Sequence, residues 1–326
     1  MNNGAAAATA AALAAGVGVS LQTSINGHAS VAVDSPVVAT AVNHGSALAL
    51  ALLVALATGA FPRAARTIRA RRAQVRWWWF LGGLMGFVAV LAIITVTPAM
   101  GVVAVGVAVT LGQLAGSVAA DSFGIGPGGR RPMGALRSAG IAVAVLAVIV
   151  GSIGRFEGAS ALAVPVVVVA GAIIAIQQAA NGWIVVVTGE PAVMSVINFA
   201  VSGFFVGSAL LVALATQPID LAALPPWAPL GGAIGAVIGV VSAVAVRIIG
   251  VLSLMLCIAA GQAMGSIALD LVVPVDRVGL TAGAVVGAVL AVAAVALAGL
   301  GAVRGRARPR ASGDAGAVPQ PTTNEP

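Results

Sequence analysis

Residues 112–121 read GQLAGSVAAD, and residues 261–270 read GQAMGSIALD. The two stretches carry Gly, Gln, Gly, Ser and Asp at matching positions, 149 residues apart, and their other residues are apolar. Because polar residues are rare in both regions, their shared spacing indicates an internal repeat.

The repeat extends over most of the chain, in two registers whose offsets are 155 and 149 residues. In the first register Gln22, Asn26, Gly27, Pro36 and Asn43 match Gln177, Asn181, Gly182, Pro191 and Asn198. In the second, Trp78, Gly82, Gly83, Gly86 and Gly101 match Trp227, Gly231, Gly232, Gly235 and Gly250. We therefore predict two homologous halves, 1–153 and 154–303, followed by a disordered basic tail at 304–326.

The composition is that of a membrane protein. Hydrophobic residues make up 60% of the 326 residues and charged residues 8%, whereas soluble domains carry about 25% charged residues. Apolar runs of about 20 residues, long enough to cross a bilayer, recur along the chain, and they do not alternate as the strands of a membrane barrel would. The predicted spans are 5–26, 36–60, 77–97, 99–120, 138–153, 161–182, 191–216, 227–246, 248–270 and 279–301.

The arginines predict the orientation of these helices. Five helices per half is an odd number, so the second half enters the membrane from the opposite side. With the N-terminus inside, the cytoplasmic segments contain Arg63, Arg66, Arg69, Arg71, Arg72, Arg76, Arg130, Arg131, Arg137, Arg247, Arg304, Arg306, Arg308 and Arg310. Only Arg155 and Arg277 then lie outside, in keeping with the positive-inside rule. The predicted fold is an all-α polytopic membrane protein with ten transmembrane helices, as two inverted five-helix repeats with cytoplasmic termini.

Several function classes lose their usual sequence support. The chain has no lysine, and therefore no phosphate-binding GxxxxGK[ST] loop, and it has no GxSxG motif. Its single cysteine, Cys257, lies in an apolar run, and its two histidines lack metal-site spacing. We predict no catalytic residue, metal or cofactor. Membrane topology explains the net charge of +7, so no nucleic-acid partner is expected.

Amide side chains are the strongest candidates for a substrate path. Gln22 and Asn26 are four residues apart, on one face of the first helix, and Asn43 follows on the second. Polar side chains at depth usually face a bundle interior or a water-filled cavity. The predicted path residues are Gln22, Asn26, Asn43, Gln113, Ser117, Gln177, Asn181, Asn198, Gln262 and Ser266.

Alternatives remain for parts of this set. Gln113 and Gln262 could equally bond between helices, and the Asn-Gly pairs 26–27 and 181–182 could mark helix ends. The glycines at 112, 116, 261 and 265 are best explained by close helix packing.

Three titratable residues are candidates for proton coupling: His44, Asp121 and Asp270. His44 lies about two turns into the second predicted helix, and Phe199 takes its place in the second half. A lone histidine more often bonds to a neighbour than relays protons. Both aspartates fall at predicted helix ends, where an interfacial position is the simpler interpretation.

Three motifs resemble the YdcZ-like group of the drug/metabolite transporter superfamily. They are Q-x-x-x-N-G on the first helix, Trp-Trp before a Gly-Gly-x-x-Gly helix, and G-Q-x-x-G-S-x-x-x-D on the fourth. Single members of that group are commonly about half this length, so the chain resembles a fused pair. The resemblance implies ten helices in two inverted repeats and export of small molecules across a bacterial inner membrane.

The function expected from the sequence is secondary transport, by export or facilitation, of small neutral or zwitterionic organic molecules with alternating access. Its partners would be such a substrate, the lipid bilayer and, through the titratable residues, protons. The alternative is a non-transporting membrane scaffold or an accessory subunit of a lipid-modifying complex. An amide-lined cavity at mid-depth would favour the transporter over the scaffold.

Overall fold

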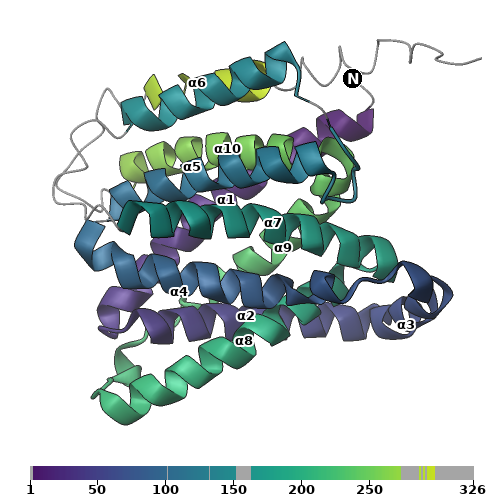
Figure 1. The fold of residues 1–326 in the computed structure, drawn as a ribbon. Helices are drawn as coiled ribbons and strands as arrows, with labels where there is room; N and C mark the ends of the chain where they lie inside the picture. Colours follow the sequence, from purple (N-terminus) through teal and green to yellow (C-terminus); the bar gives the residue numbers. More distant parts are fainter. Residues whose placement is uncertain are drawn as a thin grey trace, which may run out of the picture.

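The computed structural model describes residues 3–100, 102–131, 133–151, 163–272 and, within 286–297, all but residues 288 and 291. In these residues the chain forms α-helices joined by short turns and 3-10 pieces (Figure 1). The first half contains α1 (Asn3–Ala32), α2 (Pro36–Ala57), α3 (Ala60–Ala70), α4 (Gly82–Met100), α5 (Val102–Phe123) and α6 (Ala135–Gly151). The second contains α7 (Ala163–Thr188), α8 (Pro191–Thr216), α9 (Pro229–Ile249) and α10 (Val251–Val272).

Length and composition identify most of these helices as membrane-spanning. Among the described residues, six are long and apolar enough to cross a bilayer, namely α1, α2, α7, α8, α9 and α10. Two shorter apolar helices cover Trp77–Ile93 and Ala135–Val150. The last predicted span, 279–301, lies partly outside the described residues. Its described part is helical, and Ala294 and Val295 pack against α5, α6 and α10.

The first helix of each half is longer than the sequence pattern predicted. α1 continues to Ala32 and α7 to Thr188, so neither Asn26-Gly27 nor Asn181-Gly182 ends a helix. The alternative that these pairs mark helix ends is therefore wrong. α7 ends one residue before Gly189, whose φ of 71° suits glycine, and Pro191 then starts α8. The polar amides interrupt the apolar pattern without interrupting the helix, because they face a cavity.

The arginine-rich connection between α2 and α4 contains the helix α3. This helix was not among the predicted spans because it is polar. α3 buries Ala60 and Ala64 against Ala55 of α2 and Val193 of α8, and its arginines are exposed. Arg63 forms an ion pair with Glu190 in the α7–α8 turn. This hydrogen bond lowers the pKa of the Glu190 carboxyl below its ordinary value. The first half is thus tied to the second at this end of the bundle.

The helices of the two halves interdigitate. α1 packs mainly against α10 and α9, and its counterpart α7 packs against α5 and α4 in the same way. α2 contacts α9 and α8 contacts α4, while α2 and α8 contact each other. Exchanging every helix for its repeat counterpart leaves this set of contacts unchanged. The main contacts of these helices thus follow the repeat, and each half packs its first helix into the other.

Glycines make these crossings possible. A Cβ at Gly112 would overlap the carbonyl oxygen of Val168 on α7, and one at Gly261 would overlap that of Leu13 on α1. Gly116 faces Ala172, and Gly265 faces Val17 and Ser20. The prediction that the glycines of the repeated motif serve close packing is confirmed.

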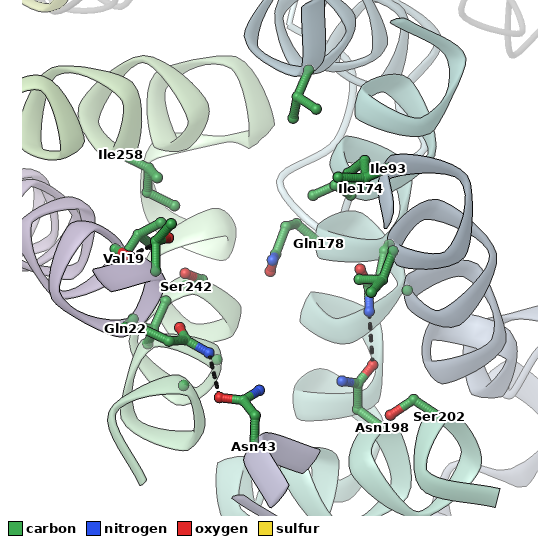
Figure 2. A pocket seen from close by; sticks show the side chains of 18 of the residues that line it. Val19, Gln22, Asn43, Ile93, Ile174, Gln178, Asn198, Ser202, Ser242 and Ile258 are labelled. Atoms are coloured by element: carbon green, nitrogen blue, oxygen red, sulfur yellow. Dashed lines mark hydrogen bonds between the residues drawn. The ribbon is translucent and has the colours of Figure 1, made fainter. Parts of the chain in front are cut away.

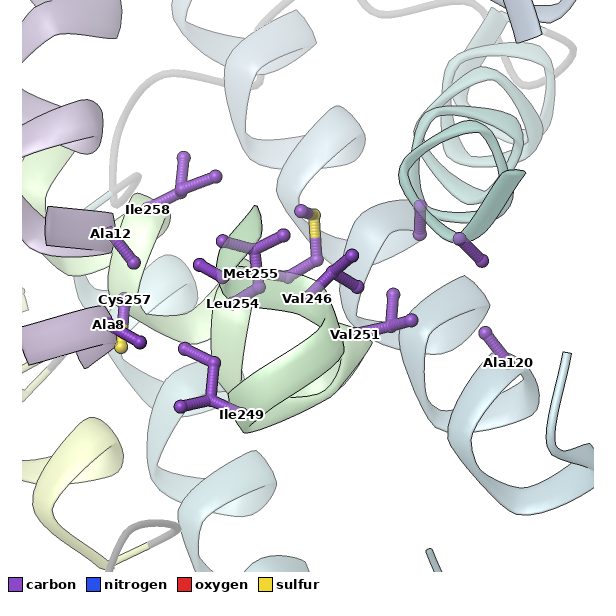
Figure 3. Close-up of a cluster of buried hydrophobic side chains, with 13 residues drawn as sticks. Ala8, Ala12, Ala120, Val246, Ile249, Val251, Leu254, Met255, Cys257 and Ile258 are labelled. Carbon is purple, nitrogen blue, oxygen red and sulfur yellow. The ribbon is translucent and has the colours of Figure 1, made fainter. Parts of the chain in front are cut away.

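The largest group of buried side chains lies where α9 and α10 meet α1, α5 and α7. Figure 3 shows Val246 and Ile249 of α9 beside Val251, Leu254 and Met255 of α10, with Ala8 and Ala12 of α1 adjoining. Cys257, 2% exposed, belongs to this group and is a free thiol, as expected for a small buried residue.

Candidate functional site

A cavity of about 530 Å³ lies between the two halves. Its walls come from α1, α2, α4 and α5 of the first half and α7, α8, α9 and α10 of the second. The volume falls within the usual range for small-molecule sites, about 300–1,000 Å³. Figure 2 shows side chains from opposite walls pointing into this space.

Eight of the ten predicted path residues line the cavity. They are Gln22, Asn26, Asn43, Gln113, Gln177, Asn181, Asn198 and Gln262. The other lining residues are hydroxyl, aliphatic and glycine positions, together with Gln178, His44, Phe199 and Met255. No carboxylate or arginine occurs among the described lining residues. The cavity combines amide and hydroxyl groups with aliphatic side chains, and among the described lining residues His44 has the only titratable side chain.

Within each half the amides form a small hydrogen-bonded group. In the first half Gln22 Nε2 and Asn26 Nδ2 each donate to Asn43 Oδ1, at 3.1 Å. In the second, Gln177 Nε2 donates to Asn198 Oδ1, also at 3.1 Å. Figure 2 shows the Gln22–Asn43 bond and, on the opposite side, Asn198 with its partner. The two groups occupy equivalent positions in the two halves and meet at one site.

Each amide pair is held by glycines of the other half. A Cβ at Gly235 would come within 2.6 Å of Gln22 Nε2, and one at Gly86 within 2.5 Å of Gln177 Nε2. Gly231 and Gly82 stand in the same relation to Asn26 and Asn181. The Gly-Gly-x-x-Gly motif therefore provides the space into which the opposite half inserts its amides.

Ser117 and Ser266 are not among the residues that line the cavity. Ser117 is fully buried, and its hydroxyl donates to the Leu114 carbonyl oxygen at 2.8 Å. The Ser266 hydroxyl lies 3.2 Å from that of Ser20, which donates to the Gln262 carbonyl oxygen. The two serines thus stabilise helices and a helix crossing, one turn away from the cavity-lining glutamines.

His44 lines the cavity from α2. Its Nδ1 is 2.9 Å from the Thr40 carbonyl oxygen of its own helix, and its ring meets that of Phe199 edge to face, with centroids 5.9 Å apart. His44 on α2 and Phe199 on α8 occupy corresponding positions in the repeat, and their side chains contact each other. His44 is the one predicted proton-coupling residue that the structure places at the cavity.

Asp121 is a buried helix cap. Its carboxylate accepts hydrogen bonds from the backbone N–H groups of Val251 and Leu252, the first residues of α10. It also pairs with Arg137, and both side chains are buried. This arrangement holds the α9–α10 junction and lies outside the cavity lining. Asp270 lies in α10, but its side chain is outside the described part of the structure.

The sequence pattern missed Gln178 and Ser242, which also line the cavity. Both differ from their repeat counterparts, Thr23 and Ile93, so a search for matched polar residues does not find them. Gln178 follows Gln177 directly, and this pair of glutamines in an apolar helix was the available signal. In the described chain no three His, Cys, Asp or Glu side chains gather as a metal site would require.

Comparison with known proteins places the chain in a family. The model of the family described as "Putative inner membrane exporter, YdcZ" matches twice, at residues 7–150 and 162–297. No curated protein matches. A solved structure described as "Crystal structure of protein" is similar over 93% of this chain and 99% of its own, with a TM-score of 0.67 and 18% identity, a likeness of fold. Since the two family matches span most of the sequence, the chain belongs to the YdcZ family of the drug/metabolite transporters and carries the family unit twice.

Proposed function

We propose that the protein is a secondary transporter that moves small neutral or zwitterionic organic molecules across the inner membrane by alternating access. The observation that carries this proposal is the cavity into which both halves direct equivalent amides. Inverted repeats around a central site are typical of secondary transporters. The family description, an inner membrane exporter, supports transport in general.

The lining supports the proposed substrate class. Amide and hydroxyl groups can bind polar solutes through hydrogen bonds, and no opposite charge is available among the described lining residues for a permanently charged solute. Burying an unpaired charge costs far more than burying a hydrogen-bonded polar group. The cavity also favours transport over the scaffold alternative, since a scaffold has no need of an amide-lined space inside its bundle.

The proposed architecture is ten spans in two inverted repeats, with both termini in the cytoplasm. The six strongly apolar helices and the two-fold pattern of helix contacts support it. The distribution of arginines supports the orientation. If protons take part, His44 is the first candidate, because it lines the cavity and Asp121 does not.

The test is flux from proteoliposomes preloaded with a mixture of neutral and zwitterionic solutes plus tetraethylammonium, measured by mass spectrometry of the exterior. We expect selective loss of one or more uncharged or zwitterionic solutes, slowed at least about tenfold by Gln113→Ala combined with Gln262→Ala. Ser117→Ala combined with Ser266→Ala is the matched control, one turn away on the same helices and outside the cavity. Equal flux from the unmodified protein, from both double variants and from preloaded liposomes without protein would disprove transport of these solutes.

A further inference from the structure

The two halves differ in how well their buried side-chain oxygens are paired. In the second half four buried side-chain oxygens have no hydrogen-bond partner: Gln178 Oε1, Asn181 Oδ1, Ser195 Oγ and Ser242 Oγ. All belong to α7, α8 and α9. Buried polar atoms in proteins are nearly always hydrogen-bonded, so a group of unpaired oxygens in one region requires an explanation.

The corresponding residues of the first half show no such deficit. The Thr23 hydroxyl donates to the Val19 carbonyl oxygen at 2.8 Å, and the Thr40 hydroxyl donates to that of Pro36 at 2.7 Å. The Asn26 amide donates to Asn43, and the fourth position is the aliphatic Ile93. The unpaired oxygens are therefore a property of the second half and not of the repeated fold.

Gln178, Asn181 and Ser242 line the cavity, whereas Ser195 does not. Asn181 Oδ1 lies against Gly82 of α4, so Gln178 and Ser242 are left as the candidates for contact with a ligand. Figure 2 shows the amide end of Gln178 extending from α7 into the space that separates it from Ser242 on α9.

The cavity also has an aliphatic side. Figure 2 places Ile258 on one wall and Ile93 and Ile174 on the other, on the side of Gln178 away from Asn43 and Asn198, with Val19 level with Gln178. An amide oxygen only accepts hydrogen bonds, so a ligand that satisfies Gln178 Oε1 must supply an N–H or O–H donor. The described lining residues offer no carboxylate to neutralise a cation.

We propose that the cavity binds a small uncharged aliphatic molecule whose N–H or O–H donors face Gln178 and Ser242 and whose apolar part lies against Val19, Ile93 and Ile258. This inference deepens the proposed function. It rests on the proposed function only because it takes the cavity as the substrate site. The two halves are then unequal partners: the first supplies amides that bond to one another, and the second supplies the unpaired oxygens that recognise the ligand.

The probes are pentanamide, which carries two N–H donors, and N,N-dimethylpentanamide, which carries none. Their dissociation constants are measured on the full chain in detergent by ligand-observed NMR. We expect pentanamide to bind at least about tenfold more tightly, because its donors satisfy oxygens that otherwise stay unpaired. Gln178→Leu and, separately, Ser242→Ala should each abolish most of this preference.

Ser208→Ala is the control, since the Ser208 hydroxyl bonds to the Phe204 carbonyl oxygen within its own helix and Ser208 does not line the cavity. It should keep the preference for pentanamide. Equal affinities for the two amides, no binding of either, or an equal loss of preference in the control would overturn the inference; the first result would mean that water satisfies these oxygens. Binding is measured without a membrane, so failure of transport in proteoliposomes and failure of donor recognition are separate outcomes.

Discussion

Gly112 is the residue at which the repeated motif has its clearest structural effect. A methyl group there would overlap the Val168 carbonyl oxygen, which is backbone and cannot move without separating α5 from α7. We predict that Gly112→Ala destabilises the protein by about 1–3 kcal/mol, the usual cost of overpacking. The measurement is thermal unfolding in detergent.

The control for this prediction is Gly207→Ala, because nothing lies within 4 Å of a Cβ at Gly207 on α8. This change should be neutral or should stabilise by less than about 1 kcal/mol, through better helix propensity. A Gly112→Ala protein as stable as Gly207→Ala would contradict the packing role.

Residues that carry the repeat could be identified from the sequence, whereas residues that break it could not. Gln22, Asn43 and their counterparts stand out because their polarity recurs at a fixed offset in apolar surroundings. Gln178 and Ser242 have no matching partner, and only their position at the cavity reveals them. Whether a polar side chain faces a cavity or its own helix, as with Gln113 and Ser117, depends on neighbouring helices that the sequence does not place.

At the scale of helices, Asp121 joins three elements. It lies in α5, caps the start of α10 and pairs with Arg137 of α6. Arg131, in the connection between α5 and α6, donates to the carbonyl oxygens of Ile248 and Ile249 at the end of α9. The α5–α6 segment therefore satisfies both helix termini at the α9–α10 junction, where backbone groups lack intrahelical partners. Spacing placed Asp121 at a helix end, but the backbone N–H groups that it caps lie about 130 residues away and have no sequence signal.

We predict that Asp121→Asn destabilises the protein by about 3–5 kcal/mol, because it leaves the buried Arg137 guanidinium without its counter-charge. Thermal unfolding in detergent measures this loss. Asp220→Asn is the control: Asp220 also caps a helix, through Ala222 N–H, but it is exposed, and its loss should cost at most about 1 kcal/mol. If Asp121→Asn is fully stable and instead abolishes a pH dependence of flux, Asp121 is a proton carrier and not a cap.

For the whole molecule, the all-helical fold and the two homologous halves follow from composition and repeats, but the exchange of helices between halves does not. Sequence similarity shows that α1 corresponds to α7, yet it does not show that α1 packs against α9 and α10. The reason is that the glycine crossings and the amide pairs are complementary between halves. Gly235 accommodates Gln22 and Gly86 accommodates Gln177, so neither half can complete its packing without the other.

The proposed inversion of the halves predicts that homologous connections lie on opposite membrane faces. α3 contacts the α7–α8 turn through Arg63 and Glu190. From this turn α8 runs for 26 residues, about 39 Å at 1.5 Å per residue, before the chain reaches 217–228. This distance exceeds the hydrocarbon thickness of about 30 Å. At the far end Leu224 and Ala228 pack against Ala29 and Ala39, beside the α1–α2 turn.

Cysteine labelling in inverted and right-side-out membrane vesicles tests this prediction, because the native Cys257 is buried. Ala65→Cys on α3 and Ala222→Cys in the later connection each introduce one exposed thiol. We expect a membrane-impermeant maleimide to label Ala65→Cys only from the cytoplasmic face, where arginines accumulate, and Ala222→Cys only from the opposite face. Labelling of both variants from one face would rule out inverted halves, and the unmodified chain should stay unlabelled from either side.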